Sequence, residues 1–258
     1  MDEKSLRKAL SGLPLKGVRF YGQIGSTNDV ALAWASDGAA DLCLICADEQ
    51  TTGRGRMGRS WFTPPGAALA FSLILRPDEN ERRRIGWFSG LGALALVGVL
   101  KKRGIPAQIK WPNDVLINER KMAGILVESV WTGADVDSVV LGMGINVTAE
   151  AIPPAAELTF PATSIESETG APVERLQLLH DVLAELIDLR RQMASGEFLF
   201  AWEQALAFRG QTVRVQLNDT EEVIGQVAGL DPDGSLKLRL PGGETRGIRF
   251  GDVHLRPL

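Results

Sequence analysis

The stretch AQIKWPNDVLINERKMAGILVESV, residues 107–130, contains three apolar runs in quick succession. Each run has the length of a strand, and the three runs lie at 107–110, 115–118 and 122–130. A turn fixed by proline, Lys110-Trp111-Pro112-Asn113-Asp114, joins the first two runs and projects four functional side chains from one corner. Three strands separated only by turns predict that a sheet dominates this part of the chain.

The flanking segments add further strands and the helices that cover the sheet. Additional strands are expected at 42–47, 67–75 and 138–147. The run Ser26-Thr27-Asn28-Asp29 predicts a helix start with hydroxyl caps, and apolar residues at helical spacing predict helices at 85–102 and 172–190. Together these elements predict an α+β domain, a mixed sheet backed by helices.

The character of the chain changes after Phe208. Short strand-like runs separated by Asn-Asp, Asp-Pro-Asp-Gly and Pro-Gly-Gly turns follow, at 212–217, 222–230, 236–240 and 245–250. About fifty residues of this pattern predict a small β-barrel that acts as a docking or lid module. We therefore expect two domains, 1–208 and 209–258.

Composition limits the class of protein. The chain has 258 residues, 45% of them hydrophobic, and a net charge of −4, which argues against general attraction to nucleic acid. The longest apolar stretches, 91–100 and 125–130, are too short to cross a bilayer. Residues 1–11 are typical of a short polar helix rather than a secretory leader. These features predict a cytoplasmic protein without a membrane partner.

Cys43 and Cys46 share the apolar segment 42–47 and permit two interpretations. The spacing is that of a metal-binding or redox pair, but no second cysteine pair exists, and His180 and His254 lie far away in sequence. The alternative is that both thiols fill the core, which suits a reducing compartment.

Gly53-Arg54-Gly55-Arg56-Met57-Gly58 matches the dinucleotide-binding pattern G-x-G-x-x-G and follows a predicted strand. That pattern must then open a helix, whereas Trp61-Phe62-Thr63-Pro64-Pro65 follows here and excludes one. The remaining alternatives are a solvated basic loop, a nucleic-acid contact through Arg54, Arg56 and Arg59, or a flexible loop whose guanidinium groups bind phosphate or carboxylate. Strand and aromatic residues on either side favour the last alternative.

Two further segments carry candidate site residues. Lys121 begins a predicted strand, where a lysine usually faces solvent. Gly142-Met143-Gly144-Ile145-Asn146 ends another strand, where glycines permit either close strand packing or the approach of a flat ring.

Taken together, these segments resemble the catalytic domain of biotin–protein ligases, in the same order and at compatible spacings, over residues 20 to 190. The matching segments are Ser26-Thr27-Asn28, Gln50, residues 53–58 (the Gly/Arg loop) with Arg59 and Trp61, Lys110-Trp111-Pro112-Asn113-Asp114, residues 120–128 and Gly142-Met143-Gly144-Ile145-Asn146. The resemblance implies a catalytic domain like that of class II aminoacyl-tRNA synthetases, followed by an SH3-like barrel.

The resemblance also implies a chemistry, in which biotin reacts with ATP to give biotinyl-adenylate and a carrier lysine then takes the biotin. The implied catalytic residues are Lys121 and Arg56. The implied biotin-binding residues are Ser26, Thr27, Asn28, Gln50, Gly53, Arg54, Gly55, Arg56, Lys121, Gly124 and Leu126. The implied nucleotide-binding residues are Arg54, Arg56, Trp61, Asn113 and Asn146. Mg²⁺ is expected with ATP, although its protein ligands are not assigned.

Several expectations about partners follow from the resemblance. The recipient is a biotin carboxyl carrier domain of a biotin-dependent carboxylase, and pairing through a sheet edge as a homodimer is expected because relatives do so. About twenty residues precede the matching segment, too few for a helix-turn-helix domain, so we expect a ligase without repressor activity and without sequence-specific DNA binding. A lipoate–protein ligase of the same fold is the nearest alternative, and a nucleic-acid-binding module that uses the Gly/Arg loop is the alternative from another class.

Overall fold

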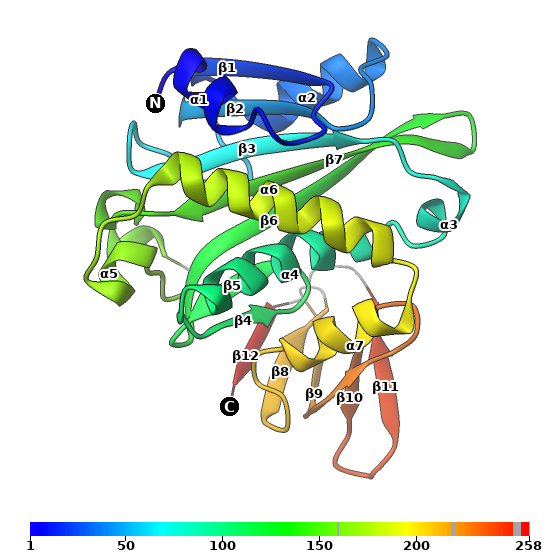
Figure 1. Cartoon of the computed structure of the whole chain (residues 1–258). Coiled ribbons are helices and arrows are strands. Elements are labelled where there is room, and N and C mark those ends of the chain that lie inside the picture. Colours follow the sequence, from blue (N-terminus) through cyan, green and yellow to red (C-terminus); the bar gives the residue numbers. More distant parts are fainter. Residues whose placement is uncertain (159, 218–219, 250–253, 258) are drawn as a thin grey trace.

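The computed structural model describes residues 1–158, 160–217, 220–249 and 254–257. A seven-stranded mixed sheet has the order β1-β2-β3-β7-β6-β5-β4, and a separate five-stranded antiparallel sheet has the order β11-β10-β9-β8-β12 (Figure 1). The predicted α+β class, with a small β module at the C-terminal end, is confirmed.

The large sheet contains the three strands that the opening stretch predicted. Its strands are β1 (Gly17–Ile24), β2 (Cys43–Gln50), β3 (Ala68–Leu75), β4 (Ala107–Lys110), β5 (Asp114–Ile117), β6 (Arg120–Thr132) and β7 (Asp135–Asn146). Only the β1–β2 pair is parallel among these described strands. The sequence did not predict β1, because this edge strand has no buried residue and therefore no continuous apolar run.

Helices cover both faces of the large sheet. The α-helices are α1 (Glu3–Ala9), α2 (Thr27–Ser36), α3 (Glu79–Arg82), α4 (Trp87–Lys102), α5 (Ile165–Thr169), α6 (Arg175–Gln192) and α7 (Gly196–Gln204). Helices α4 and α6 pack together on one face, while α2 packs against β2, β3, β6 and β7 (Figure 1). None of the helices within the described ranges is both long and apolar enough to cross a membrane.

Strand alternation supplies both faces with apolar side chains. Leu44 and Leu73, which pair across β2 and β3, belong to the core under α4 and α6, whereas Ile45 and Ile74 belong to the core under α2. Every residue of β3 is buried, because the strand is covered on both faces, and its sequence is therefore an almost continuous apolar run.

The two cysteines fill the two different cores. Cys43 packs beneath α2 and Cys46 lies in the core on the opposite face. Burial raises the pKa of the Cys46 thiol to about 12. Side chains three apart on a strand point to opposite faces, so these thiols cannot bind one metal ion. The core-filling interpretation therefore holds for this segment.

A turn of the C-terminal sheet contacts Trp111 of the turn at 110–114 directly. The strands of this sheet are β8 (Thr212–Gln216), β9 (Glu222–Leu230), β10 (Leu236–Arg239), β11 (Thr245–Ile248) and β12 (His254–Pro257). The predicted Asp-Pro-Asp-Gly turn is present, with Gly234 in the left-handed region at φ 84°, and its carbonyl oxygen accepts a hydrogen bond of 3.0 Å from Trp111 Nε1. The predicted Asn218-Asp219 turn and Phe250 lie outside the described residues. The domain division at 208 stays a prediction.

Candidate active site

A cavity of about 560 Å³ lies where β6 and β7 meet the Gly/Arg loop and the start of α2. All the site residues singled out from the sequence line it, namely Ser26, Thr27, Asn28, Gln50, Gly53, Arg54, Gly55, Arg56, Trp61, Asn113, Lys121, Gly124, Leu126 and Asn146. Residues up to 120 positions apart are therefore gathered around one space.

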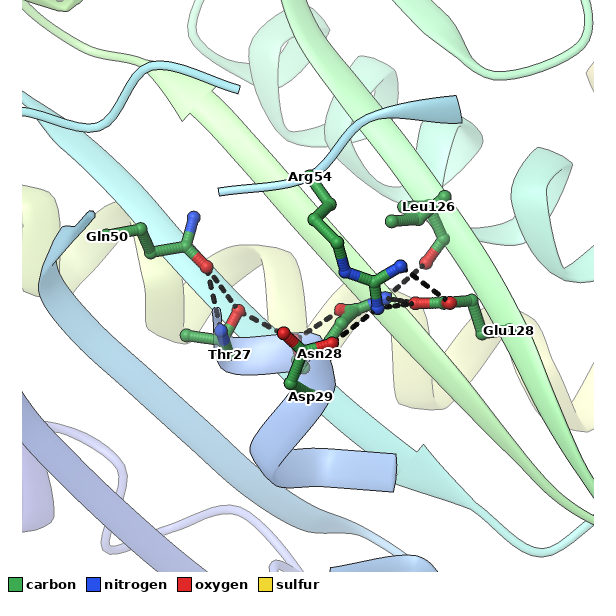
Figure 2. A network of polar contacts seen from close by, with 8 residues as sticks. Thr27, Asn28, Asp29, Gln50, Arg54, Leu126 and Glu128 are labelled. Atoms are coloured by element: carbon green, nitrogen blue, oxygen red, sulfur yellow. Dashed lines mark hydrogen bonds and ion pairs between the residues drawn. The ribbon is translucent and has the colours of Figure 1, made fainter. Parts of the chain in front are cut away.

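One end of the cavity is formed by the first turn of α2. Ser26 is the N-cap residue, but its side chain does not cap the helix, so the predicted hydroxyl cap is wrong. Gln50 takes over this role, because its Oε1 accepts hydrogen bonds from Thr27 N at 2.8 Å and from Thr27 Oγ1 at 3.0 Å (Figure 2). Gln50 in turn donates to Thr63 Oγ1 at 3.2 Å. This end presents neutral polar groups.

The Gly/Arg loop forms a small closed hairpin over the cavity. Trp61 N donates to Gly53 O at 2.8 Å and Gly55 N donates to Arg59 O at 2.6 Å. A short 3₁₀ turn, η1 (Arg56–Gly58), closes the hairpin, with Met57 in the left-handed region at φ 61°. No α-helix follows, so the dinucleotide-binding interpretation fails here as the sequence predicted.

Another part of the cavity lining is charged. Asp114 Oδ1 lies 2.7 Å from Lys121 Nζ, and Oδ2 lies 3.5 Å from Lys110 Nζ. Burial on its own would raise the pKa of the Asp114 carboxyl, but the ammonium groups of Lys121 and Lys110 outweigh it and hold this pKa below its ordinary value of 3.8. Lys110 is also buried and lies 4.4 Å from the ring centroid of Phe160. A carboxylate thus fixes both ammonium groups beside the cavity.

Trp61 lies across a floor made of glycines. A Cβ atom on Gly144 would overlap Nε1 and Cε2 of the indole and lie 2.8 Å from Cδ1, and one on Gly124 would lie 3.2 Å from Cζ3. Lys121 Nζ lies 5.3 Å from the centroid of the same ring. The glycines of β6 and β7 therefore admit a flat ring, and the ring that lies there is the indole of Trp61.

Gly142 makes room for a different side chain on the same strand. A Cβ atom there would lie 2.8 Å from Cγ of Asn28. Asn28 is buried, and its amide already donates to Leu126 O at 3.3 Å and to Glu128 Oε2 at 2.8 Å. Asn28 thus connects α2 to β6.

The two asparagines expected near the nucleotide are held by main-chain carbonyls. Asn113 Nδ2 donates to Ile125 O at 3.0 Å, and Asn146 Nδ2 donates to Thr163 O at 3.1 Å. Arg56 Nη1 donates to Asn113 Oδ1 at 3.0 Å. The turn at 110–114 therefore places Asn113 where the guanidinium group of Arg56 contacts it.

Sequence reasoning missed several polar residues of the site. Ser72 is the one polar residue in the apolar run of β3, and its hydroxyl lies 2.6 Å from Asn28 Oδ1. That interruption was a usable signal. Lys110 and Asp114 lay in a recognised motif but were not assigned a role. Asp29 and Glu128 carried no distinguishing signal, because a charged residue in a first helical turn or late in a strand is ordinary.

Known proteins resemble this chain over nearly its whole length. A family model described as "Biotin/lipoate A/B protein ligase family" matches residues 21–146, and one described as "Biotin protein ligase C terminal domain" matches residues 208–256. The biotin–[acetyl-CoA-carboxylase] ligase of Mycobacterium tuberculosis is 34% identical over 99% of this chain and 96% of its own length. The chain belongs to the biotin–protein ligase family.

Two further relatives of this ligase chain differ in how much of their own length is matched. The bifunctional ligase/repressor BirA of Bacillus spizizenii is 35% identical, over 90% of this chain and 72% of its own. The solved structure of the Aquifex aeolicus biotin protein ligase in complex with biotin and ATP has a TM-score of 0.79 and 27% identity, and covers 95% of this chain and 100% of its own. The described fold is therefore the ligase fold, with its C-terminal module included.

Proposed function

We propose that the chain activates biotin with ATP to form biotinyl-5′-adenylate and then transfers biotin to a lysine of a biotin carboxyl carrier domain. In the first step a biotin carboxylate oxygen attacks the α-phosphorus of ATP and pyrophosphate leaves. In the second step the lysine amine attacks the acyl carbon and AMP leaves. The observation that carries the proposal is that one cavity is lined both by the neutral polar side chains of Ser26, Thr27 and Gln50 and by the cations Arg56 and Lys121.

The neutral end suits the ureido ring of biotin, which offers N–H donors and a carbonyl acceptor. Ser26 is buried, lines the cavity and has a hydroxyl that does not cap its own helix. Thr27, Gln50 and the main chain at Gly53 are the other proposed partners of the ring. Buried polar groups of a ligand require such hydrogen bonds, because an unpaired one costs about 1–3 kcal/mol.

The cationic end suits two anions that must meet. Carboxylate and phosphate repel each other, so a site that joins them must supply positive charge as the new bond forms. Lys121 and Arg56 are the proposed sources, and donors of this kind typically contribute about 3–4 kcal/mol each. Because Asp114 already orients Lys121, its ammonium group needs little rearrangement when the substrates bind.

The nucleotide is proposed to lie against Trp61, Asn113 and Asn146. The described residues bring no three acidic, cysteine or histidine side chains together, and two lysines neutralise Asp114. This donor set does not fit a protein-held Mg²⁺ ion, and we expect the ion to arrive on the triphosphate.

The direct test is incubation of the purified chain with biotin, Mg-ATP and a carboxyl carrier domain, followed by detection of biotin on the carrier lysine. Lipoate in place of biotin, with pyrophosphate release as the measurement, tests the lipoate alternative. Release with lipoate and not with biotin would overturn the proposal. Binding of any RNA or DNA strand with a steep salt dependence would instead favour the nucleic-acid alternative.

The absence of repressor activity and the homodimer both stay predictions. A sequence-specific gel shift by the purified chain at physiological salt would contradict the first. A single species of monomer mass over the working concentration range in analytical ultracentrifugation would contradict the second.

A further inference from the structure

Arg54 lies between two carboxylates that come from different elements (Figure 2). Its Nη1 donates to Glu128 Oε1 at 3.0 Å and its Nη2 donates to Glu128 Oε2 at 2.8 Å, which is a bidentate pair. The same Nη2 lies 2.7 Å from Asp29 Oδ1. Glu128 belongs to β6 and Asp29 to the first turn of α2, so one side chain of the Gly/Arg loop is tied to both.

Glu128 extends this contact to the neutral end of the cavity. Its Oε2 also accepts a hydrogen bond from Asn28 Nδ2 at 2.8 Å. Asn28 Oδ1 lies 2.6 Å from the Ser72 hydroxyl, which lies 2.8 Å from Thr27 Oγ1. Thr27 in turn contacts Gln50. A continuous polar chain therefore runs from the Gly/Arg loop to the proposed ureido site.

The two arginines of the loop have different surroundings. The guanidinium group of Arg54 faces two carboxylates, and the hydrogen bond to Glu128 is the main reason why the pKa of Arg54 is raised. Arg56 instead contacts the neutral amide of Asn113. Three of the five N–H donors of Arg54 already serve these two carboxylates, and the carboxylates would repel a substrate anion that approached the remaining donors.

We propose that Arg54 is a positioning residue, which fastens the Gly/Arg loop to α2 and β6 through Glu128 and Asp29 and does not itself bind the carboxylate or phosphate. The inference rests on the proposed function. It reassigns Arg54 from the anion-binding role that the family resemblance implied. Through their contacts with Arg54, Glu128 and Asp29 hold the Gly/Arg loop closed over the biotinyl-adenylate.

The test is a double-mutant cycle with Arg54→Ala, Glu128→Gln and the double variant, measured as the dissociation rate of biotinyl-adenylate from the purified enzyme. Each single variant should release the adenylate about 5- to 10-fold faster, as expected for a partly exposed ion pair of about 1 kcal/mol or slightly more. The double variant should be no faster than the faster single variant, because both changes remove the same contact. Arg83→Ala, which removes an exposed pair with Glu79 on α3, is the matched control and should leave the rate unchanged.

A direct ligand contact predicts a different pattern. Arg54→Ala would then release the adenylate much faster while Glu128→Gln stayed near the wild-type rate, and that result would overturn the proposal. Amide hydrogen exchange of residues 53–61 without ligand gives a second readout. Both single variants should exchange faster there, whereas loss of a ligand contact alone would leave exchange unchanged, and unchanged exchange would also count against the proposal.

Failure of this inference is distinguishable from failure of the proposed function. A wild-type chain that forms no adenylate from biotin and ATP contradicts the function. A wild-type chain that forms it, with an additive cycle, contradicts only the role of Arg54. Far-ultraviolet circular dichroism and thermal melting of each variant identify any that fail to fold.

Discussion

Gly144→Ala is expected to prevent Trp61 from closing over the cavity. Gly144 lies in β7 and pairs with Gly124 of β6, and the indole lies across both. An alanine Cβ would overlap two ring atoms and lie 2.8 Å from a third, whereas ordinary van der Waals contact begins at 3.4 Å. Because the Cβ is fixed by the backbone of a central strand, the ring must move.

The expected effect on closure of the site by Trp61 follows from the free-energy cost of that overlap. Inserting an extra carbon into packed surroundings costs about 1–3 kcal/mol, which corresponds to about a 5- to 150-fold change in an equilibrium constant. Trp61 lies on a largely exposed hairpin, so we expect the hairpin rather than the sheet to move and the cost to fall on closure of the site. The free energy of unfolding should therefore change by less than about 1 kcal/mol, because the sheet can accommodate the alanine once Trp61 has moved.

The assay is the dissociation rate of biotinyl-adenylate, with urea denaturation in parallel. We expect a rate at least about fivefold above wild type. Gly22→Ala is the control, because Gly22 also lies in a strand but a Cβ there has nothing within 4 Å. A Gly144→Ala enzyme with the wild-type dissociation rate would refute the role given to Trp61.

Three further predictions concern the cationic end of the cavity. Lys121→Ala should slow adenylate formation in single turnovers by about 100-fold or more, since one donor contributes about 3–4 kcal/mol; an unchanged rate would remove Lys121 from the mechanism. Arg56→Gly should release the adenylate faster than wild type, because one guanidinium group no longer holds the intermediate, and a wild-type off-rate would disprove this role. Asp114→Asn should lower the free energy of unfolding by roughly 3 kcal/mol at pH 7, because it leaves the ammonium groups of Lys110 and Lys121 without their carboxylate. The pKa of Asp114 is lowered in the folded chain, so the ionised carboxylate stabilises the fold above about pH 3.8. This stabilisation is lost as the pH falls from there through the lowered pKa of the folded chain. The difference between wild type and Asp114→Asn in urea denaturation should therefore shrink below that pH, and a constant difference down to pH 3 would contradict the assignment.

The sequence alone determined the class of fold, because local patterns encode it. The runs in 107–130 became β4, β5 and β6, and the turn-rich segment after Phe208 became the second sheet. It also identified the Gly/Arg loop and rejected its dinucleotide interpretation, since Pro64 and Pro65 rule out a following helix regardless of context.

Only the tertiary structure decided which side chains of the site contact one another. Arg54 and Arg56 are two residues apart and look equivalent in sequence, yet one faces Glu128 and Asp29 while the other contacts Asn113. The helix start at Ser26-Thr27-Asn28-Asp29 was predicted correctly, but the hydroxyl cap was not, because Gln50 of β2 accepts the hydrogen bond from the first turn instead. Contacts between residues far apart in the chain depend on strand order and register, and short-range patterns do not specify either. Sequence therefore supplied the groups of the site, and the packing of β2, β6 and α2 gave each group its partner.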